Sequence, residues 1–523
     1  MPRLWTMYRL RLLATVVALI LIQGVAAAVA AFATRDLFSA LHTGANLPLI
    51  AMASLALSGA VIGLTRVSAR LRGELIGQSY ALDVRTALFD QEAAMARHDV
   101  AIRRTGYTSL RFVGDLTAIR NWPSRGLPRL AAAAILLPAT LAVLGALNPQ
   151  FLIGTAPVLM VGLIAITLGG LRLSDRHKRL RLRRGRIAAD MAERMPIAPL
   201  LYAFGRHATE KDRIVQRSKE MIDAALDRTR LSETLKAVPD LLAGVLALIV
   251  IWSGVQTGTS TANIAAGLAA IGIALAPTRD LATVWNHLSA FKVARAKCAA
   301  ALARPRRGAD LCTSDLKAGP VSIRLEDVFA GPIASLSQTV SAGNIVSVEG
   351  KTGSGKSLIL NILAGFDTTE AGTIRLSGQV IEDIKPGRLR QSVALVTVTP
   401  PILKGSLRRA LTLGLEKRPS DQDILNAADR FGLGELVNNR GGLDAKIAEA
   451  GRDLSDGQRV RVALVRAALG EPGLIMLDSI AEYLDPECRT TLCAYLGQTG
   501  ATVLAVDRSR MLGLNYSDRL FLR

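Results

Sequence analysis

The hydrophobic pattern of this chain changes character about midway along its length. The first part contains apolar runs with few or no charged residues, each long enough to cross a bilayer as a helix. Six such runs occur, at Leu12–Thr34, Leu47–Thr65, Leu130–Leu147, Phe151–Leu171, Val238–Gln256 and Thr261–Pro277. Several are rich in Ala and Gly, which suits close packing of membrane helices, and prolines are tolerated there. The pattern predicts a six-span transmembrane domain.

Two other interpretations of these runs are weaker. The first run follows Arg9 and Arg11 and ends near an Ala-Phe-Ala sequence, as a cleaved signal peptide would. It is longer than the apolar core of a usual signal peptide and further runs follow it, which favours a retained helix. Buried helices of a water-soluble protein would not explain six runs of this length in one half of a chain.

The charged residues between the runs predict the orientation of the helices. Arginine is frequent between the second and third runs and very dense between the fourth and fifth. The dense patch comprises Arg172, Arg176, Lys178, Arg179, Arg181, Arg183, Arg184 and Arg186. The short connections 148–150 and 257–260 carry no charge. Because Lys and Arg are enriched in cytoplasmic loops, we expect both long, helical-patterned connections and both termini in the cytoplasm.

The composition agrees with a membrane protein of this kind. The formal net charge is +21, from 64 Lys and Arg against 43 Asp and Glu. In a soluble protein this excess would indicate nucleic-acid binding, but the basic residues lie between apolar runs and only 4% of residues are aromatic. We therefore expect a lipid bilayer and no nucleic acid as partner. The 4 cysteines, Cys298, Cys312, Cys488 and Cys493, form no C-x-x-C pair, so a zinc-type site is not expected.

A different pattern, of short β-branched runs alternating with amphipathic helices, occupies the second half. Proline, glycine and charge cluster before it, so we place the transmembrane domain at 1–302, a linker at 303–320 and a second domain at 321–523. The runs that predict strands are Val321–Leu325, Gly343–Glu349, Val393–Val396, Leu474–Asp478 and Thr502–Val506. Strands alternating with helices indicate an α/β domain around a mainly parallel sheet.

The strongest motif of the second domain follows the strand Gly343–Glu349. It fits the phosphate-loop pattern G-x-x-x-x-G-K-[ST] and leads into an apolar helical run, a context that disfavours an accidental glycine-rich turn. Glycines let backbone N–H groups approach phosphate oxygens, and the positive end of the helix dipole favours the same anion. We predict a nucleotide site in which Lys356 contacts the β- and γ-phosphates and Ser357 binds Mg²⁺. It comprises Gly350, Lys351, Thr352, Gly353, Ser354, Gly355, Lys356 and Ser357.

A second motif completes a recognisable pattern. The sequence Leu454-Ser455-Asp456-Gly457-Gln458 begins a helical run, and the apolar strand Leu474–Asp478 comes after it and ends in a carboxylate. Alone, the first segment is an ordinary capped helix start. In this order and spacing after a phosphate loop, the two segments resemble the ATP-binding cassette (ABC) family. Nearly the whole chain is similar to an ABC exporter half-transporter, an α-helical six-span transmembrane domain followed by an α/β P-loop nucleotide-binding domain.

The resemblance implies roles for residues outside the phosphate loop. Asp478 would hold Mg²⁺ opposite Ser357, and Asp485 occupies the position of the family's D-loop aspartate. The signature segment Leu454–Gln458 would cap ATP held by the phosphate loop of a second half-transporter. Weaker similarities to the family's first and second intracellular loops lie at 104–120 and 203–206.

Several positions depart from the pattern of an efficient ATPase of this family. Ser479 stands where the family has a glutamate that polarises water, and a hydroxyl is no base near neutral pH. Asp507 stands at the switch histidine, where a carboxylate would repel phosphate unless protonated or bridged by a cation. Val398 replaces a glutamine that binds Mg²⁺ or orients water, and Asp456 replaces a usual glycine. The adenine-stacking aromatic has no clear match, Phe329 being the nearest candidate.

These departures imply a chain that binds Mg-ATP at its own site without an intact catalytic residue there. Loss of the water-polarising group alone could cost ~10²–10⁴-fold in rate. Such one-sided loss suits a heterodimer whose second half-transporter carries the competent site. Two alternatives stay open: an ATP-gated membrane scaffold or regulator that transports nothing, and a slow homodimeric exporter.

The expected location is a bacterial inner membrane, as the resemblance implies. The transported substrate is not identified by the sequence. Few charges within the spans hint at an apolar or amphipathic cargo, and Asp240, Arg279 and Asp280 are more simply explained as residues near span ends.

Overall fold

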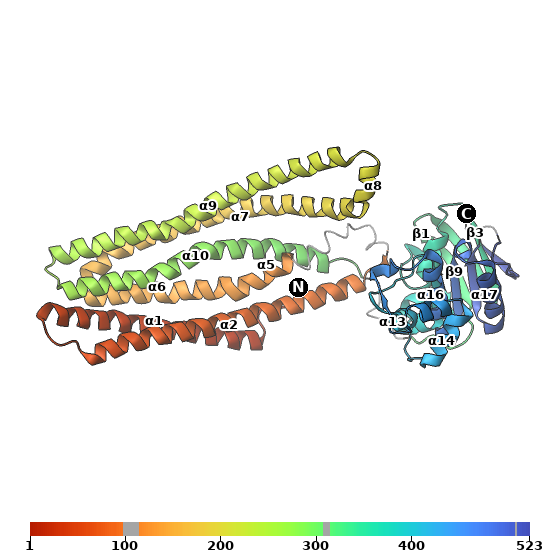
Figure 1. Cartoon of the computed structure of the whole chain (residues 1–523), viewed down its shortest axis with the longest axis horizontal. Helices are drawn as coiled ribbons and strands as arrows, with labels where there is room; N and C mark the ends of the chain where they lie inside the picture. The colour runs from red at the N-terminus through yellow and green to blue at the C-terminus, as the bar shows by residue number, and fades with distance from the viewer. Residues whose placement is uncertain (98–113, 307–313, 508–509, 523) are drawn as a thin grey trace. The chain divides into compact units, whose positions relative to one another are not determined.

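The computed structural model describes residues 1–97, 114–306, 314–507 and 510–522, and Figure 1 labels its elements. The chain divides into two compact units, which are described separately. The membrane unit comprises Met1–Ala93 and Ile102–Arg304, and the nucleotide unit comprises Ala94–Ala101 and Pro305–Arg523.

The membrane unit is a bundle of long helices. The described residues include six helical stretches long and apolar enough to cross a membrane, which confirms the six predicted spans. They are α1 (Met7–Thr43), α2 (Leu49–Ala93), the third span, α7 (Pro149–Arg194) with α8 (Ala198–Ala203), α9 (His207–Gln256) and α10 (Thr261–Leu302). The third span consists of α5 (Leu116–Asn121), the π-helical turn η2 (Trp122–Gly126) and α6 (Leu127–Leu147). Within this unit α1 packs along α2, α7 along α9, and α6 along α10 (Figure 1).

Small residues permit the close approach of these helices, as the Ala- and Gly-rich runs suggest. A Cβ on Gly77 of α2 would lie 2.6 Å from the backbone oxygen of Arg120, and one on Gly162 of α7 would lie 2.2 Å from Leu242 Cδ1. A larger side chain at Gly77 would meet backbone and push α2 away from the third span, whereas one at Gly162 would require the Leu242 side chain to move.

The two uncharged connections meet at one end of the bundle. Asn148 caps α7 by accepting a hydrogen bond from the Gln150 N–H at 2.8 Å, and its amide donates to Thr259 Oγ1 at 2.6 Å. The predicted second intracellular loop is the turn between α8 and α9, where Gly205 has a φ of 68°. Residues 104–113 of the predicted first loop lie outside the described residues.

The nucleotide unit contains two main sheets. A parallel sheet has the order β11-β3-β10-β9-β6, which confirms the predicted α/β domain around a parallel sheet. Its strands are β3 (Ile345–Gly350), β6 (Val393–Thr397), β9 (Leu474–Asp478), β10 (Thr502–Val506) and β11 (Asp518–Leu522). An antiparallel sheet, β2-β1-β4-β5, comprises β1 (Ile323–Ala330), β2 (Ile333–Val340), β4 (Ala371–Leu376) and β5 (Gln379–Val380).

Helices cover both faces of the parallel sheet and form two apolar cores. Helix α11 (Lys356–Leu363) lies in the core between the two sheets, and α16 (Asp456–Gly470) and α17 (Pro486–Thr499) belong to the other. The second core also includes α13 (Leu407–Thr412), α14 (Asp421–Arg430) and α15 (Gly434–Asn439). A short helix α12 (Pro386–Ser392) precedes β6, and β7 (Gly405–Ser406) pairs with β8 (Lys446–Ile447).

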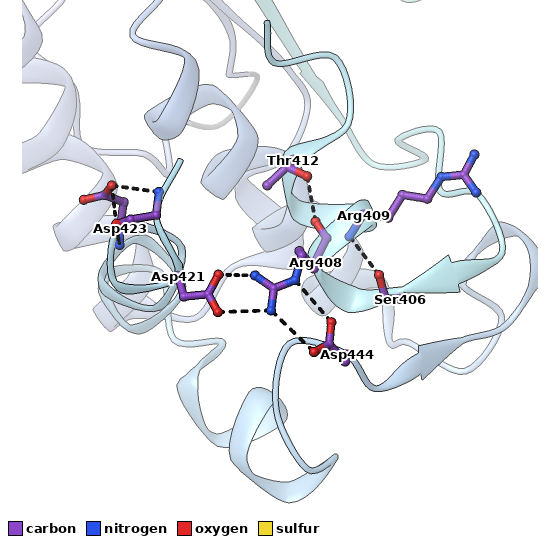
Figure 2. A network of polar contacts seen from close by, with 8 residues as sticks. Ser406, Arg408, Arg409, Thr412, Asp421, Asp423 and Asp444 are labelled. Atoms are coloured by element: carbon purple, nitrogen blue, oxygen red, sulfur yellow. Dashed lines mark hydrogen bonds and ion pairs between the residues drawn. The ribbon is translucent and has the colours of Figure 1, made fainter. Parts of the chain in front are cut away.

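An ion-pair network links α13, the start of α14 and the segment before β8 (Figure 2). Arg408 of α13 donates to Asp444 Oδ1 at 3.2 Å and to Asp421 Oδ2, at the start of α14, at 3.1 Å. Hydrogen bonds to these two carboxylates raise the pKa of Arg408 above its ordinary value. Ser406 caps α13 by accepting from the Arg409 N–H at 3.3 Å. One guanidinium therefore joins three segments that are not adjacent in sequence.

Candidate nucleotide site

Four strands of the parallel sheet deliver the predicted site residues to one edge. The register pairs Val506 of β10 with Asp478 of β9, and Asp478 with Thr397 of β6. Strand β3, which is parallel to β10, ends at Gly350. Because all four run in the same direction, the phosphate loop, Val398, Ser479 and Asp507 all come after strand ends at the same edge. This is the edge where ligands bind in open α/β sheets.

The phosphate loop has the backbone that its glycines allow. Gly350 has a φ of 151°, and a Cβ there would lie 2.5 Å from the backbone oxygen of Leu522. Gly355 has a φ of 92°, and a Cβ there would lie 2.6 Å from Ile333 Cγ1. The loop turns directly into α11 at Lys356, so first-turn N–H groups are directed at the cradle.

Two side chains show that the loop fits a phosphate group. Lys356 is buried, and its Nζ donates to the backbone oxygens of Gly350 and Lys351, each at 2.7 Å. Ser354 Oγ is buried and has no hydrogen-bond partner among the described residues. An oxyanion in the loop would accept hydrogen bonds from the Lys356 ammonium and from the Ser354 hydroxyl. The residues present therefore fit the triphosphate of a nucleotide.

The groups predicted to bind Mg²⁺ are a hydroxyl and a carboxylate. Ser357 is exposed in the first turn of α11, a helix that lies against β9, and Asp478 ends β9. Both are hard oxygen donors of the kind that Mg²⁺ uses together with phosphate oxygens. Phe329 lies on β1 and is 40% exposed, which leaves its ring available for contact.

Ser479 provides no general base beside these groups. It has a φ of 54°, and its N–H donates to the backbone oxygen of Val506 at 3.2 Å. Its hydroxyl lies 3.5 Å from Asp478 Oδ1, so the oxygen is turned towards that carboxylate. A neutral hydroxyl cannot take a proton from water near neutral pH.

The Asp507 carboxylate is hydrogen-bonded to donors of the chain itself. It is 7% exposed, and its carboxylate accepts hydrogen bonds from the Met511 N–H, the Leu512 N–H and the Tyr516 hydroxyl, all at 3.0 Å. Burial raises the pKa of Tyr516, and the charge and hydrogen bond of Asp507 raise it further, so the hydroxyl stays a donor. Asp507 thus closes the turn after β10. No motif in the sequence pointed to Met511, Leu512 or Tyr516 as partners of Asp507.

Val398 begins a segment that is joined to the signature helix through Arg466. This residue of α16 donates to the backbone oxygen of Pro401 at 2.9 Å and also to that of Ala410 in α13. Burial lowers the pKa of Arg466 to about 10, so the guanidinium is still charged at neutral pH. Arg466 therefore links α16 both to α13 and to the segment that follows β6. The sequence shows Arg466 only as an arginine on a predicted helix and did not indicate that it makes this link.

The signature segment forms a capping box at the start of α16. Ser455 Oγ accepts from the Gln458 N–H at 3.2 Å, and Gln458 Oε1 accepts from the Ser455 N–H at 3.0 Å. Asp456 is exposed and pairs with Arg459, and Leu454 is buried. A Cβ on Gly457 would lie 2.8 Å from the backbone oxygen of Tyr483, so glycine is required there.

Asp485 caps α17 and is also tied to the signature helix. Its Oδ1 accepts from the Cys488 N–H at 2.8 Å, and its other oxygen pairs with Arg461 of α16. Arg461 in turn donates to the backbone oxygen of Gly432 at 3.0 Å. The exposed start of α16 and the start of α17 therefore form one connected surface. Arg461 was not singled out by the sequence pattern.

Comparison with known proteins agrees with this geometry. Residues 12–275 match the family model described as ABC transporter transmembrane region, and residues 333–481 match the one described as ABC transporter. The Escherichia coli glutathione/L-cysteine transport system ATP-binding/permease protein CydD is 27% identical over 78% of this chain and 73% of its own length. The ATP-dependent lipid A-core flippase of Pseudomonas aeruginosa is 22% identical over 81% of this chain and 72% of its own.

A solved structure has the same fold over almost the whole chain. The structure of a bacterial Atm1-family ABC exporter with ATP bound superposes with a TM-score of 0.83 at 18% identity, covering 98% of this chain and 94% of that one.

Proposed function

Because the chain belongs to the ABC transporter family and is a six-span integral membrane half-transporter of the exporter type, we propose that it is the degenerate-site subunit of an ATP-driven exporter. It holds Mg-ATP at its own phosphate loop and hydrolyses it poorly. Its signature segment, Leu454–Gln458, completes the competent site of a second half-transporter. The location that goes with this role is a bacterial inner membrane, with the nucleotide unit and both termini in the cytoplasm.

The observation that carries the proposal is the closed hydrogen-bond set of Asp507. Three donors of the chain itself take up a carboxylate that stands at the family's switch position. A carboxylate fixed in this way cannot donate to a γ-phosphate, and its charge opposes one. Ser479 adds no base, and Val398 adds neither a metal ligand nor a water-orienting amide. Hydrolysis therefore lacks its proton acceptor and its phosphate contact at this site.

The binding half of the site is retained. Lys356 and Ser354 bind phosphate oxygens, and Ser357 and Asp478 hold Mg²⁺, which when bound neutralises charge on the β- and γ-phosphates. A nucleotide that stays bound stabilises whatever assembly it bridges by mass action. A slow site of this kind keeps two nucleotide units in contact while the partner's site turns over.

Turnover by the isolated chain tests the first half of the proposal. The purified full-length chain should bind Mg-ATP and hydrolyse it barely above background, and Ser479→Ala should change neither property more than about twofold, because a hydroxyl supplies no general base. Brisk hydrolysis that survives Ser479→Ala would overturn the degenerate site. Steady recovery from the native membrane as a homodimer would overturn the heterodimer and leave the slow homodimeric exporter.

A matched pair of capping-box variants tests the second half. Ser455→Ala removes the cap of α16, and Ser420→Ala removes an equivalent capping box, with Asp423, at the start of α14. Each loses about 1 kcal/mol of capping energy. In complex with a half-transporter that carries Asp-Glu and His at the matching positions, Ser455→Ala should lower ATP turnover about tenfold or more. Ser420→Ala should lower it less than twofold, and equal effects would contradict the role of the signature segment.

A further inference from the structure

Basic side chains from five spans of the membrane unit converge at one end of the apolar segments. Each lies within a few turns of an apolar run, on the side of the long connections and away from the Asn148 end. We name them the interhelical basic cluster: Arg70 of α2, Arg125 of η2, Arg129 of α6, His177 and Arg184 of α7, Arg228 of α9, and His287 of α10.

Contacts between helices show that Arg129, His177 and Arg228 are turned towards α10. Arg129 donates to Thr283 Oγ1 of α10 at 2.8 Å and lies 3.4 Å from His287 Nε2. Asn286 Oδ1, also on α10, accepts from Arg228 at 3.2 Å and lies 2.8 Å from His177 Nε2. One helix, α10, therefore gathers side chains from the third, fourth and fifth spans.

Five members of the cluster are drawn partly into the bundle, and two lie at its edge. Arg125, Arg129, His177, Arg228 and His287 are half-buried, whereas Arg70 and Arg184 are exposed. Arg70 donates to the backbone oxygen of Ser124, next to Arg125, at 3.1 Å, so α2 is joined to η2 at this end of the bundle.

Carboxylates balance only part of this charge. Glu74 lies 3.8 Å from Arg70, where it is shared with Arg120, and Asp280 lies 3.1 Å from Arg129. Among the residues that the structure describes, Arg125, Arg184 and Arg228 form no ion pair.

Two of these arginines also have buried nitrogens without acceptors. The Nε atoms of Arg125 and Arg228 are buried and make no hydrogen bond to any described residue. A buried guanidinium nitrogen without an acceptor is costly, and arginine is the side chain suited to paired recognition of phosphate or carboxylate. The cluster therefore has more donors and positive charge than the described residues satisfy.

The π-helical turn η2 places Arg125 in this position. Its wide turn is closed by a hydrogen bond from the Leu127 N–H to the Trp122 backbone oxygen, and the Trp122 ring stacks on Phe291 of α10 with centroids 6.1 Å apart. Single π-turns inside α-helices are frequent at functional sites. The turn is fixed to α10, the helix that carries Thr283, Asn286 and His287.

We propose that the interhelical basic cluster binds an oxyanion, a phosphate or carboxylate group of the transported cargo. This rests on the proposed exporter function and names the chemical class of what is carried. The sparse charges within the spans hinted at an apolar or amphipathic cargo, and the cluster narrows this to a cargo that carries an anionic group. Arg279 is not part of the site, because its Nε bonds Asp240 Oδ1 at 2.8 Å and both side chains are mostly exposed.

Ligand binding to the full-length chain in zwitterionic nanodiscs, without nucleotide, tests this site. The probes are dodecyl phosphate, dodecanol with the same chain, and inorganic phosphate, followed through tryptophan fluorescence. Trp122 lies in η2 and Trp285 lies beside Asn286, so both report on the cluster. Dodecyl phosphate should bind at least about tenfold more tightly than dodecanol, as expected for charge-assisted bonds to arginine. Competition by inorganic phosphate identifies a small soluble anion, and its failure to compete identifies an amphiphile; both uphold the site.

Matched charge variants distinguish binding at the cluster from a general effect of positive charge on the chain. Arg125→Gln and Arg228→Gln should each weaken dodecyl phosphate binding about tenfold, and Arg125→Lys, which keeps the charge, by no more than about threefold. Arg279→Gln removes the same charge from the paired arginine and should change binding less than twofold. Equal binding of dodecanol, or an equal loss in Arg279→Gln, would overturn the proposal. Because no ATP is present, either result leaves the hydrolysis experiments and the degenerate site untouched.

Discussion

The phosphate loop and the turn after β10 lie at the same sheet edge and use their polar atoms in opposite ways. In the loop, Ser354 Oγ has no partner among the described residues, and Lys356 holds loop carbonyls that a phosphate can replace. In the turn, the carboxylate of Asp507 is fully engaged by backbone and tyrosine donors. The first region is prepared for a ligand, and the second stabilises the chain itself.

Under the proposed function, this difference assigns binding and hydrolysis to separate parts of the site, as follows. Binding depends on one continuous segment, Gly350–Ser357, and on Asp478. Hydrolysis depends on the residues directly after β6, β9 and β10, which come from distant parts of the sequence. Each strand end can therefore change its side chain without disturbing the cradle.

The largest expected effect is on ATP binding. Lys356→Ala should weaken binding of Mg-ATP about 100-fold, because a buried ammonium contributes charge-assisted hydrogen bonds to phosphate. Titration with a fluorescent ATP analogue would measure the change. Lys351→Ala, an exposed lysine of the same loop, should change binding less than threefold. Unchanged affinity in Lys356→Ala would show that the nucleotide binds elsewhere.

The second effect is on stability and concerns the turn after β10. Asp507→Ala leaves two N–H groups and a hydroxyl without their acceptor, and should lower the free energy of unfolding by about 3 kcal/mol. Tyr516→Phe removes one of the three bonds and should cost about 1 kcal/mol. Urea denaturation of the two variants would measure both values. A loss below about 0.5 kcal/mol in Asp507→Ala would contradict a stabilising role for this carboxylate.

The third effect is on turnover. Ser479→Glu restores a carboxylate base at the family position, but Asp507 and Val398 remain. Turnover of the isolated chain should therefore rise less than about tenfold, although a general base can contribute ~10²–10⁴-fold. Phosphate release under saturating ATP would measure it. Recovery of the full range by this one substitution would show that Asp507 does not impede the reaction.

The smallest effect is on a thiol beside the turn. Burial raises the pKa of Cys493, and the negative charge of Asp507 raises it further, because both disfavour the thiolate. Alkylation of Cys493 should therefore reach half its maximal rate above the ordinary thiol value of about 8.5. Asp507→Asn should lower that midpoint without returning it to the ordinary value, since burial remains. Cys488 in the same peptide map should not respond, and an unshifted Cys493 would remove Asp507 as a cause.

Local pattern predicted those parts of the fold whose signal is continuous in sequence. The six spans, β9 and β10 were predicted from unbroken apolar runs, and the latter two have the predicted bounds, Leu474–Asp478 and Thr502–Val506. The antiparallel strands β2 and β4 were not predicted, because their half-buried patterns, with positive φ at Ser335 and Gly372, depend on pairing with β1. The helix α13 is short and is joined through Arg408 to the start of α14 and to Asp444, partners that no local pattern indicates.

The candidate site divides in the same way. The phosphate loop and the signature segment are contiguous motifs, so their positions could be stated residue by residue. The partners of Asp507 could not, because they depend on how the chain turns after β10. The basic cluster could not either, since Arg129 and His287 stand far apart in sequence and come within 3.4 Å of each other only through the packing of the bundle. The sequence predicted that Asp280 lies near a span end, but it did not indicate its ion pair with Arg129, at 3.1 Å.

The π-helical turn η2 has one consequence for how this span can change. The hydrogen bond from the Leu127 N–H to the Trp122 oxygen encloses one residue more than an α-helical turn does, so deleting one residue from Trp122–Gly126 would leave an ordinary α-helical turn. The hydrophobic length of Leu127–Leu147 would be unaltered. A single codon therefore decides whether the third span has the wide turn that carries Arg125, independently of whether the span is long enough to insert.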